Sequence, residues 1–292
     1  MAKKNCIGTG LSGLIGSRLV ELLSDRFQFE DLSYDTGVDI TDKDAVFSRL
    51  KKNDAPWVLH MAAKADVESC EQDKPHHEQG MAWKINVIGT KNIVDLCNAL
   101  GKKVIYISTD FVFDGNKDVY TEEDIPHPVN WYAHTKYEGE KIVGSEKNNI
   151  IMRIAYPYRT VNTQKQDFVH SLLSAFKKQQ LVKALSDHIF TPTFIDDIAH
   201  SLALLIEKNA CGIYHVVGSE SLTPYEAAQK LAASFHFRQD LISPITIEEY
   251  YRNRAVRPKK LRLSNNKIQS LGMSLLGFSE GLRVLQEQGI TV

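Results

Sequence analysis

No stretch of this sequence approaches the roughly 20 consecutive apolar residues that a membrane-spanning helix requires. Charge of neither sign dominates: 35 lysines and arginines stand against 36 aspartates and glutamates, which gives no electrostatic basis for nucleic acid as the main partner. Residues 1–4 lead straight into a short apolar run and leave no room for the apolar region of a signal peptide. We therefore expect a cytoplasmic protein that binds neither membrane nor nucleic acid.

Cysteines and metal-binding motifs are also scarce. The four cysteines lie far apart and form no C-x-x-C motif: Cys6, Cys70, Cys97 and Cys211. We interpret them as reduced, mostly buried small hydrophobic residues, because no motif places an activating histidine beside any of them. His76 and His77 follow Pro75, and we interpret them as part of a solvated turn, because adjacent side chains do not face one site on a helix. The sequence predicts no metal site.

What the first half does contain is a regular alternation of short apolar runs and helical patterns. It predicts strands at residues 5–9, 31–35, 57–61, 104–108 and 149–154, and helices at residues 13–24, 42–51, 82–100 and 132–144. Strands separated by helices favour right-handed βαβ units and a parallel sheet covered on both faces. The predicted fold is therefore α/β, a Rossmann doubly wound sheet, with residues 1–155 as the dinucleotide-binding domain.

The pattern becomes looser after residue 155. Helices are predicted at residues 168–179 and 224–235, the second capped by Thr223, and a strand at residues 213–217. We interpret residues 156–292 as a smaller C-terminal substrate-binding lobe, with some segments returning to the main sheet.

A glycine loop lies between the first predicted strand and the first helix. Glycines at three-residue spacing allow a tight turn, close approach of a pyrophosphate and packing of the helix on the strand. The amino end of the helix then offers free N–H groups to phosphate. Because the loop stands directly between a strand and an amphipathic helix, we expect it to bind a dinucleotide. The predicted contacts are Gly10, Ser12, Gly13, Leu14, Ile15 and Gly16.

The identity of the dinucleotide depends on the residues after the second predicted strand. Asp35 lies about 20 residues beyond the loop, where an acidic residue would bind the adenosine ribose. Asp39 and Ile40 follow, beside the expected adenine position. No arginine stands directly after the strand to hold a 2′-phosphate, which favours NAD(H), with NADP(H) left open. The alternative is that Asp35 only caps a turn before Gly37.

The predicted helix at residues 132–144 carries a candidate catalytic pair. Tyr132 and Lys136 are four residues apart and therefore share one face of the helix. A neighbouring ammonium stabilises a phenolate, so we expect Lys136 to lower the pKa of Tyr132 toward the range where it exchanges protons. The alternative interpretation is an ordinary pair on the surface of a helix.

A hydroxyl stands at the end of the strand predicted at residues 104–108. Ligands bind at the carboxyl ends of strands in open α/β sheets, and Thr109 lies there. Its hydroxyl would donate to a carbonyl oxygen that Tyr132 protonates. A cap at the end of the strand is the alternative role of Thr109.

These segments resemble the extended short-chain dehydrogenase/reductases, and within them the dTDP-4-dehydrorhamnose reductase group. The resemblance covers most of the chain, and the methionine adenosyltransferase regulatory β-subunit resembles the same group. The segments that carry it are residues 60–63, 86–90, 107–115, 128–140, 191–199 and 212–216, together with Arg257-Pro258.

The resemblance implies a role for each matching residue. Thr109 binds the substrate carbonyl, Tyr132 donates the proton and Lys136 holds the nicotinamide ribose. The backbone along the cofactor is that of Met61, Ala62 and Ala63, and the residues on the substrate side are Asp110, Phe111, Tyr156 and Arg257. Dehydratases of the superfamily carry Asp-Glu after the catalytic threonine. Phe111 cannot transfer protons, so 4,6-dehydration is disfavoured.

The substrate half departs from the family pattern. Tyr156 stands where the reductases carry a tryptophan, and Arg159 where a glycine is usual. Residues 187–193 lack the family's Gln and Gly, and Lys64 replaces an aromatic residue. The cofactor half is intact, whereas the sugar half is altered.

The first hypothesis is an NAD(P)H-dependent reductase of a nucleotide-linked 4-keto sugar, similar to dTDP-4-dehydrorhamnose reductase. The second is a dinucleotide-binding regulatory subunit without turnover, and the third is a nucleotide-sugar epimerase that retains NAD through its cycle. The resemblance also implies a homodimer formed through helices such as 82–100 and 132–144.

Overall fold

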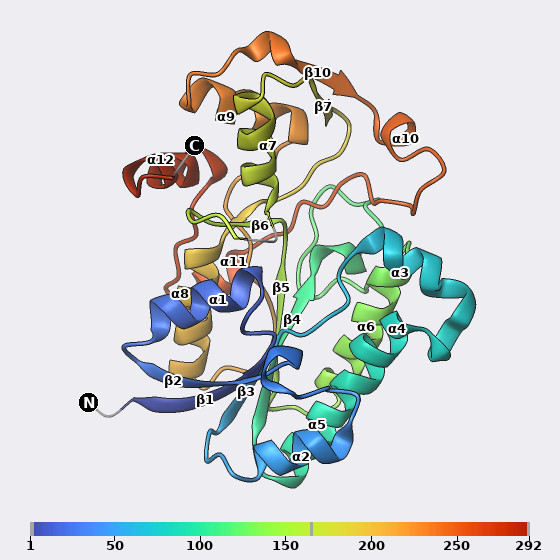
Figure 1. Ribbon diagram of the computed structural model, residues 1–292, viewed down its shortest axis with the longest axis vertical. Helices are drawn as coiled ribbons and strands as arrows, with labels where there is room; N and C mark the ends of the chain where they lie inside the picture. The colour runs from blue at the N-terminus through green and yellow to red at the C-terminus, as the bar shows by residue number, and fades with distance from the viewer. Residues whose placement is uncertain (1–2, 164–165, 291–292) are drawn as a thin grey trace.

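In the computed structural model, which describes residues 3–163 and 166–290, a six-stranded parallel sheet forms the centre of the molecule (Figure 1). The strands lie in the order β2(Phe27–Leu32), β1(Lys4–Thr9), β3(Trp57–His60), β4(Lys103–Thr109), β5(Ile150–Ile154) and β9(Gly212–His215). From β1 the chain runs outward to β2 and then returns to β3 on the other side. This reversal makes a switch point at the carboxyl ends of β1 and β3. The predicted Rossmann-type α/β fold is confirmed.

Helices cover both faces of the sheet. On one face lie α1(Leu14–Leu23) and α8(Ile195–Glu207), and on the other α2(Lys43–Leu50), α5(Thr90–Ala99) and α6(Trp131–Gly144) (Figure 1). In β4, Ile105 and Ile107 pack toward the first face, while Val104 and Tyr106 pack toward the second. A strand buried on both sides is apolar at every position, which explains the continuous apolar run. Each such side chain contributes about 1.5–3 kcal/mol by its burial.

The helix predicted at residues 82–100 is helical throughout but not uniform. It consists of α4(Met81–Trp83), a π-helical segment η3(Lys84–Gly89) and α5. The Asn86 side chain in η3 accepts from the N–H of Lys64 (2.8 Å), and its Nδ2 donates to the Lys64 carbonyl (3.0 Å) and to Thr135 (2.9 Å). The π-helical turn therefore lies where a side chain of the helix is bound to the loop after β3. Such irregular turns often occur at functional sites.

The second strand begins and ends earlier than predicted. It was expected at residues 31–35, but β2 spans Phe27–Leu32, and η1(Tyr34–Thr36) follows as a 3₁₀ turn. The Thr36 hydroxyl accepts from the N–H of Ser33 (3.0 Å) in this turn, and Gly37 ends it at φ +77°. Ser and Thr side chains that bond to the backbone favour turns over strands. The prediction was wrong because β2 is an edge strand in which Gln28, Glu30 and Asp31 interrupt the apolar residues, so no continuous apolar run marks its bounds.

A smaller lobe lies above the carboxyl ends of the main strands in the view of Figure 1. It contains α7(Phe168–Lys177), α9(Pro224–Ser234) and α12(Phe278–Glu287), with the strand pairs β7(Val182–Leu185)–β10(Ile242–Ile245) and β6(Pro157–Tyr158)–β8(Thr193–Phe194). The predicted helices at 168–179 and 224–235 are confirmed, and Thr223 caps α9 in a capping box with Glu226. From this half of the chain, β9 joins the main sheet and α8 packs on α1.

The remaining elements are short. They are α3(Val67–Asp73), η2(Lys74–Gln79), η4(Asp110–Val112), η5(Gln239–Leu241), α10(Ile247–Tyr250) and α11(Asn266–Gln269). Within the described ranges no helix is long and apolar enough to span a bilayer. His76 and His77 are exposed in η2, and the described part of the chain holds no cluster of three or more metal-binding side chains. Three of the four cysteines are buried, as predicted, and burial raises the pKa of Cys6, Cys70 and Cys97 to about 12.

Candidate active site

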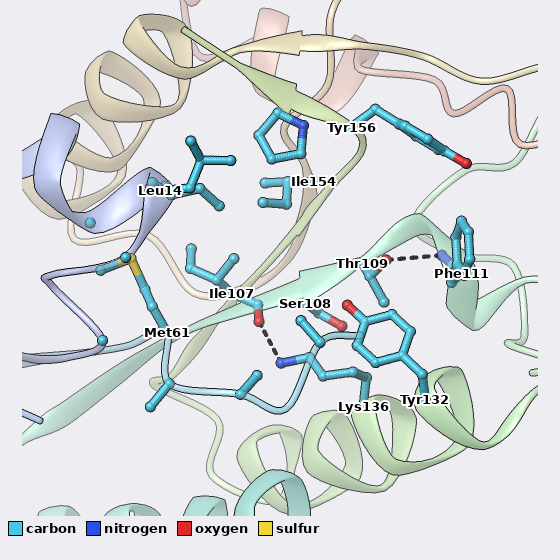
Figure 2. A pocket seen from close by; sticks show the side chains of 18 of the residues that line it. Leu14, Met61, Ile107, Ser108, Thr109, Phe111, Tyr132, Lys136, Ile154 and Tyr156 are labelled. Carbon is cyan, nitrogen blue, oxygen red and sulfur yellow. Dashed lines mark hydrogen bonds between the residues drawn. The ribbon is translucent and has the colours of Figure 1, made fainter. Parts of the chain in front are cut away.

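A cavity of about 580 Å³ lies at the carboxyl ends of the central strands, and Figure 2 shows side chains that line it. Most of the site residues expected from the sequence line it. These are Gly10, Ser12, Gly13, Leu14, Ile15, Gly16, Met61, Ala62, Ala63, Thr109, Asp110, Phe111, Tyr132, Lys136, Tyr156 and Arg257. They come from segments distributed over almost the whole chain, which the parallel sheet brings to one edge.

The glycine loop forms one wall, and its glycines are required by close packing. Gly10 has φ +70°, and a Cβ there would lie 2.9 Å from the backbone nitrogen of Ala62. A Cβ on Gly16 would lie 2.5 Å from the carbonyl oxygen of Gly10. Gly13 caps α1 without a side chain, so no side-chain acceptor of the cap occupies the N–H groups of the first helical turn. The wall therefore fits the pyrophosphate of a dinucleotide.

A buried chain of hydrogen bonds fixes the glycine loop relative to the loop after β3. The Thr90 hydroxyl donates to the carbonyl of Asn86 (2.7 Å), so Nε2 of His60 must donate to Thr90 (2.9 Å). Nδ1 of His60 then accepts from the hydroxyl of Thr9 (2.7 Å), whose oxygen accepts from the N–H groups of residues 61 and 62. Burial lowers the pKa of His60 to about 3, which keeps the ring neutral. These hydrogen bonds therefore hold the start of the glycine loop in a defined position relative to residues 61 and 62.

Three residues expected at the cofactor lie outside the cavity lining. Asp35 is exposed on η1, Ile40 packs against Gly89, and the carboxylate of Asp39 accepts from the hydroxyls of Tyr34 (2.7 Å) and Thr41 (2.8 Å). Burial acts to raise the pKa of Asp39, but these hydrogen bonds and the one from the N–H of Thr41 together lower it. Because β2 already ends at Leu32, Asp35 lies beyond the strand, on the exposed turn, and not at its carboxyl end.

Asp31 is the acidic residue near the glycine loop that the sequence reasoning missed. It is the penultimate residue of β2, and its carboxylate accepts from the N–H of Leu11 (3.3 Å) and the hydroxyl of Ser33 (2.8 Å). The signal in the sequence was the pair Glu30-Asp31 inside a weak apolar pattern, which marks the end of an edge strand. Asp31 therefore occupies the position near the loop that was expected for Asp35.

The helix α6 brings Tyr132 and Lys136 to the cavity. Its cap Asn130 accepts from the N–H of Ala133 (2.9 Å) and, through Nδ2, donates to the carbonyl of Val256 (2.9 Å). The Lys136 ammonium donates to the carbonyl of Ile107 (2.8 Å), as Figure 2 shows, and lies 3.9 Å from the centre of the Tyr106 ring. Burial lowers the pKa of Lys136 to about 7, although the charge of Glu140 opposes the shift.

The pKa of Tyr132 moves in the direction opposite to the one expected from the sequence. Burial raises this pKa above its ordinary value, and the Thr109 hydroxyl opposes the rise. Lys136 donates to the Ile107 carbonyl instead. A buried phenolate is costly without a cation beside it. The protein groups alone therefore keep Tyr132 protonated, in the form of a proton donor.

Thr109 ends β4 and also caps the short helix η4. Its oxygen accepts from the N–H of Phe111 (3.2 Å; Figure 2), and its hydroxyl donates to Oδ1 of Asp110 (3.0 Å). Thr109 therefore has the capping role that was its alternative interpretation, and it also lines the cavity. Asp110 is 2% exposed, and its Oδ2 has no hydrogen-bond partner within the described ranges. Burial raises the pKa of this carboxyl to about 7.

Tyr156 forms the wall toward the smaller lobe, with a backbone φ of +41°. Its ring packs against Phe190 and Phe111. Nδ1 of His188 donates to the carbonyl of Pro258 (2.9 Å), so Nε2 accepts from the Tyr156 hydroxyl (3.2 Å). Burial lowers the pKa of His188 to about 4, in agreement with a neutral ring.

Arg257 reaches the same wall from the C-terminal segment. Its guanidinium donates to Glu68 (2.9 Å) and to the Ala255 carbonyl (2.9 Å), and it lies 4.7 Å from the centre of the Tyr251 ring. Glu68 belongs to α3, far from Arg257 in sequence. No local sequence pattern predicted the pairing of Arg257 with Glu68.

Arg159 was noted in the sequence only as a departure from the family. The structure gives it a contact with the cofactor wall: its Nη1 donates to the carbonyl of Leu14 (3.0 Å) and to the hydroxyl of Ser17 (2.7 Å) on α1. Its Nη2 forms an ion pair with Glu21. A glycine at this position would leave the smaller lobe without this contact to α1.

The chain is similar to several known proteins over nearly its whole length. A family model described as the RmlD substrate binding domain matches residues 4–288. The dTDP-4-dehydrorhamnose reductase of Aggregatibacter actinomycetemcomitans is 30% identical over 275 residues, which cover 89% of this chain and 90% of that protein. Methionine adenosyltransferase 2 subunit beta of Rattus norvegicus is 33% identical over 250 residues, 81% of this chain and 71% of that protein.

A solved structure agrees with this assignment. The dTDP-4-dehydrorhamnose reductase from Bacillus anthracis in complex with NADP superposes with a TM-score of 0.89 at 27% identity, over 98% of this chain and 100% of that chain. A UDP-glucose 4-epimerase from Thermus thermophilus complexed with NAD, at 21% identity and a TM-score of 0.79, shares the fold. The chain therefore belongs to the family of the RmlD substrate binding domain, within the extended short-chain dehydrogenase/reductases.

Proposed function

We propose that this protein reduces the C4 ketone of a nucleotide-linked sugar with a nicotinamide dinucleotide, with dTDP-4-dehydrorhamnose as the first substrate to test. The observation that carries the proposal is the single cavity in which the glycine loop faces Thr109, Tyr132 and Lys136. The reductase relatives, similar over most of their length, support it.

The residues of the cavity have distinct roles in this proposal. A bound reduced nicotinamide supplies the hydride. Tyr132, which burial keeps protonated, delivers a proton to the oxygen at C4, and the Thr109 hydroxyl donates a hydrogen bond to the same oxygen. Lys136 holds the nicotinamide ribose through its ammonium. Phe111, Tyr156 and Arg257 contact the substrate, and Asp110 lies beside Thr109 on the same side of the cavity.

For the cofactor we propose NADP(H) before NAD(H). The support is the NADP complex of the Bacillus anthracis reductase, and Asp35, the residue first expected at the adenosine ribose, is exposed and lies outside the cavity lining. Asp31, which already accepts from Leu11 and Ser33, is the acidic group that would oppose a 2′-phosphate. The ratio of the Michaelis constants for NADPH and NADH tests this choice, and a clear preference for NADH contradicts it.

The test of the reductase is a panel of nucleotide-linked 4-keto sugars, with oxidation of NADPH and NADH followed at 340 nm. We expect turnover with at least one 4-keto sugar and none with the corresponding 4-hydroxy sugar. Turnover of none, in protein that binds NADPH, would exclude the proposed reaction.

A second candidate is a dinucleotide-binding subunit without turnover. The 33% sequence identity to methionine adenosyltransferase 2 subunit beta, together with the altered substrate wall, favours this role as the alternative. Co-purification with a transferase, combined with NADPH binding and no turnover of any keto sugar, would support this role.

Sedimentation equilibrium of the purified chain tests the expected homodimer.

A further inference from the structure

The hydrogen bonds around Thr109 raise a difficulty for its proposed role. A hydroxyl has one proton to donate and two lone pairs to accept with. The oxygen of Thr109 accepts from the N–H of Phe111, and its proton is directed to Oδ1 of Asp110. If Asp110 is an ionised acceptor, the Thr109 proton is bound to the carboxylate and none remains for the substrate oxygen.

The surroundings of Asp110 do not favour an ionised carboxylate. The side chain is buried, and Oδ2 has no hydrogen-bond partner in the described part of the chain. The titratable groups around it are Tyr132 and Lys136 from α6, Tyr156 after β5 and Arg257 from the C-terminal segment. The Lys136 ammonium is bound to the Ile107 carbonyl and the Arg257 guanidinium to Glu68 and Ala255. Neither cation pairs with Asp110. Burial raises the pKa of Asp110 more than the hydrogen bonds from Thr109 and from the N–H groups of Asp110 and Phe111 lower it, because a buried carboxylate without a cation is costly.

We propose that Asp110 works as a neutral carboxylic acid, which donates its own proton through Oδ1 to the oxygen of Thr109 and so frees the Thr109 hydroxyl to donate to the substrate carbonyl. Asp110 is then a positioning residue that acts through Thr109. This inference rests on the proposed reductase function of the same cavity.

The arrangement uses both lone pairs of the Thr109 oxygen. The Thr109 oxygen accepts from Phe111 and from Asp110, and its single proton is available to the substrate. Oδ2 of Asp110 becomes a neutral carbonyl oxygen, which is far less costly to leave unpaired than a charged one. Burial raises the pKa of Asp110 to about 7, which agrees with this form at and below neutral pH. Ionisation at higher pH would draw the Thr109 proton back and place a negative charge beside the developing alkoxide.

A direct test is the titration of the carboxyl carbon of Asp110 by NMR in protein labelled with [4-¹³C]aspartate, with the resonance assigned by its loss in Asp110→Asn. We expect a midpoint near 7 in the full-length protein. A midpoint near 4, the ordinary range of aspartate, would overturn the proposal.

Kinetics with NADPH and dTDP-4-dehydrorhamnose supply the second test. Thr109→Val should lower kcat about 100-fold, as the loss of one hydrogen-bond donor to a developing oxyanion does. Asp110→Leu, which keeps the branched shape at Cγ without a donor or an acceptor, should lower kcat about 10-fold by leaving Thr109 without its donor. In the Thr109→Val background, Asp110→Leu should have little further effect, because Asp110 acts through Thr109. Independent, multiplicative losses would contradict this coupling.

The pH profile separates this role from a merely electrostatic one. The amide of Asp110→Asn donates to Thr109 but does not ionise, so Lys136, with a pKa of about 7, is left as the group that titrates in this range. The alkaline decline of kcat should therefore become less steep and shift to higher pH. If Asp110 were instead an ionised neighbour that only supports the Lys136 ammonium, its removal would lower the pKa of Lys136 and shift the decline to lower pH.

The outcomes also separate the two proposals. Absence of turnover with Asp110 titrating near 7 rejects the reductase alone, and turnover with Asp110 titrating near 4 rejects the proton arrangement alone.

Discussion

The two walls of the cavity are built in different ways. The cofactor wall consists of short continuous segments, the glycine loop and residues 61–63, which Thr9 and His60 join through hydrogen bonds between neighbouring strands. The substrate wall contains single residues from distant segments, such as Tyr156, whose hydroxyl is bound to His188, and Arg257, which is bound to Glu68. A motif can encode the first kind of wall, whereas the second depends on how the smaller lobe packs against the sheet. Substitutions in the two walls should therefore have different effects.

The largest effect is expected where the walls meet, at the proton donor. Tyr132→Phe should lower kcat about 10³-fold, within the range that positioned acid–base groups contribute, while the Kd of NADPH changes less than about threefold. Stopped-flow single-turnover kinetics and titration of NADPH fluorescence measure the two quantities. Turnover within tenfold of the wild type would contradict the assignment of Tyr132.

A methyl group in the cofactor wall should weaken dinucleotide binding next most strongly. The added Cβ of Gly16→Ala would lie 2.5 Å from the backbone of the glycine loop and displace it, at a cost of about 1–3 kcal/mol, which is about 5- to 150-fold in the Kd of NADPH. Gly144→Ala is the matched control, because its Cβ meets only Ile151 at 3.8 Å. Equal Kd values for the two variants, measured by isothermal titration calorimetry, would show that close packing of the loop is not needed.

A change in the substrate wall should leave the dinucleotide unaffected. His188→Ala removes the link between the Tyr156 hydroxyl and the Pro258 carbonyl, and thereby the fixed position of the segment that carries Arg257. We expect the KM of the keto sugar to rise about 10-fold, in line with the roughly 1–3 kcal/mol cost of a broken buried hydrogen-bond network, with the Kd of NADPH unchanged. A parallel loss of NADPH affinity would mean that the two walls are not separable.

The smallest effect is expected on the pH dependence of the free energy of unfolding, through Asp110, which lies beside Thr109 in the cavity. The pKa of Asp110 is raised from 3.8 to about 7 by burial, so between these values the folded protein binds more protons at this site than the unfolded chain. This site therefore makes the free energy of unfolding decrease as pH rises from about 4 to about 7. Asp110→Asn removes that contribution, so the variant should gain stability relative to the wild type over this interval. Urea denaturation at several pH values measures the difference, and a constant difference would contradict the raised pKa.

The sequence by itself determined the regular half of the molecule. Apolar runs such as residues 104–107 predict strands buried on both faces, and Gly10, Gly13 and Gly16 predict a close approach of backbones, because both features depend on residues near one another in the chain. The helix positions of Tyr132 and Lys136 follow from the same local periodicity. Weak local signals failed first: the polar edge strand β2 was placed four residues late, and Asp35 was named in place of Asp31.

Only the tertiary structure decided the rest. Whether the Lys136 ammonium faces the phenol of Tyr132 or the Ile107 carbonyl depends on how α6 packs on β4. The burial that raises the pKa of Asp110, the pairing of Arg257 with Glu68 and the contact of Arg159 with α1 arise between segments far apart in the chain. Hydrogen bonds and desolvation depend on distances in space, which local sequence patterns do not encode, so the chemistry of these side chains appears only once the chain is folded.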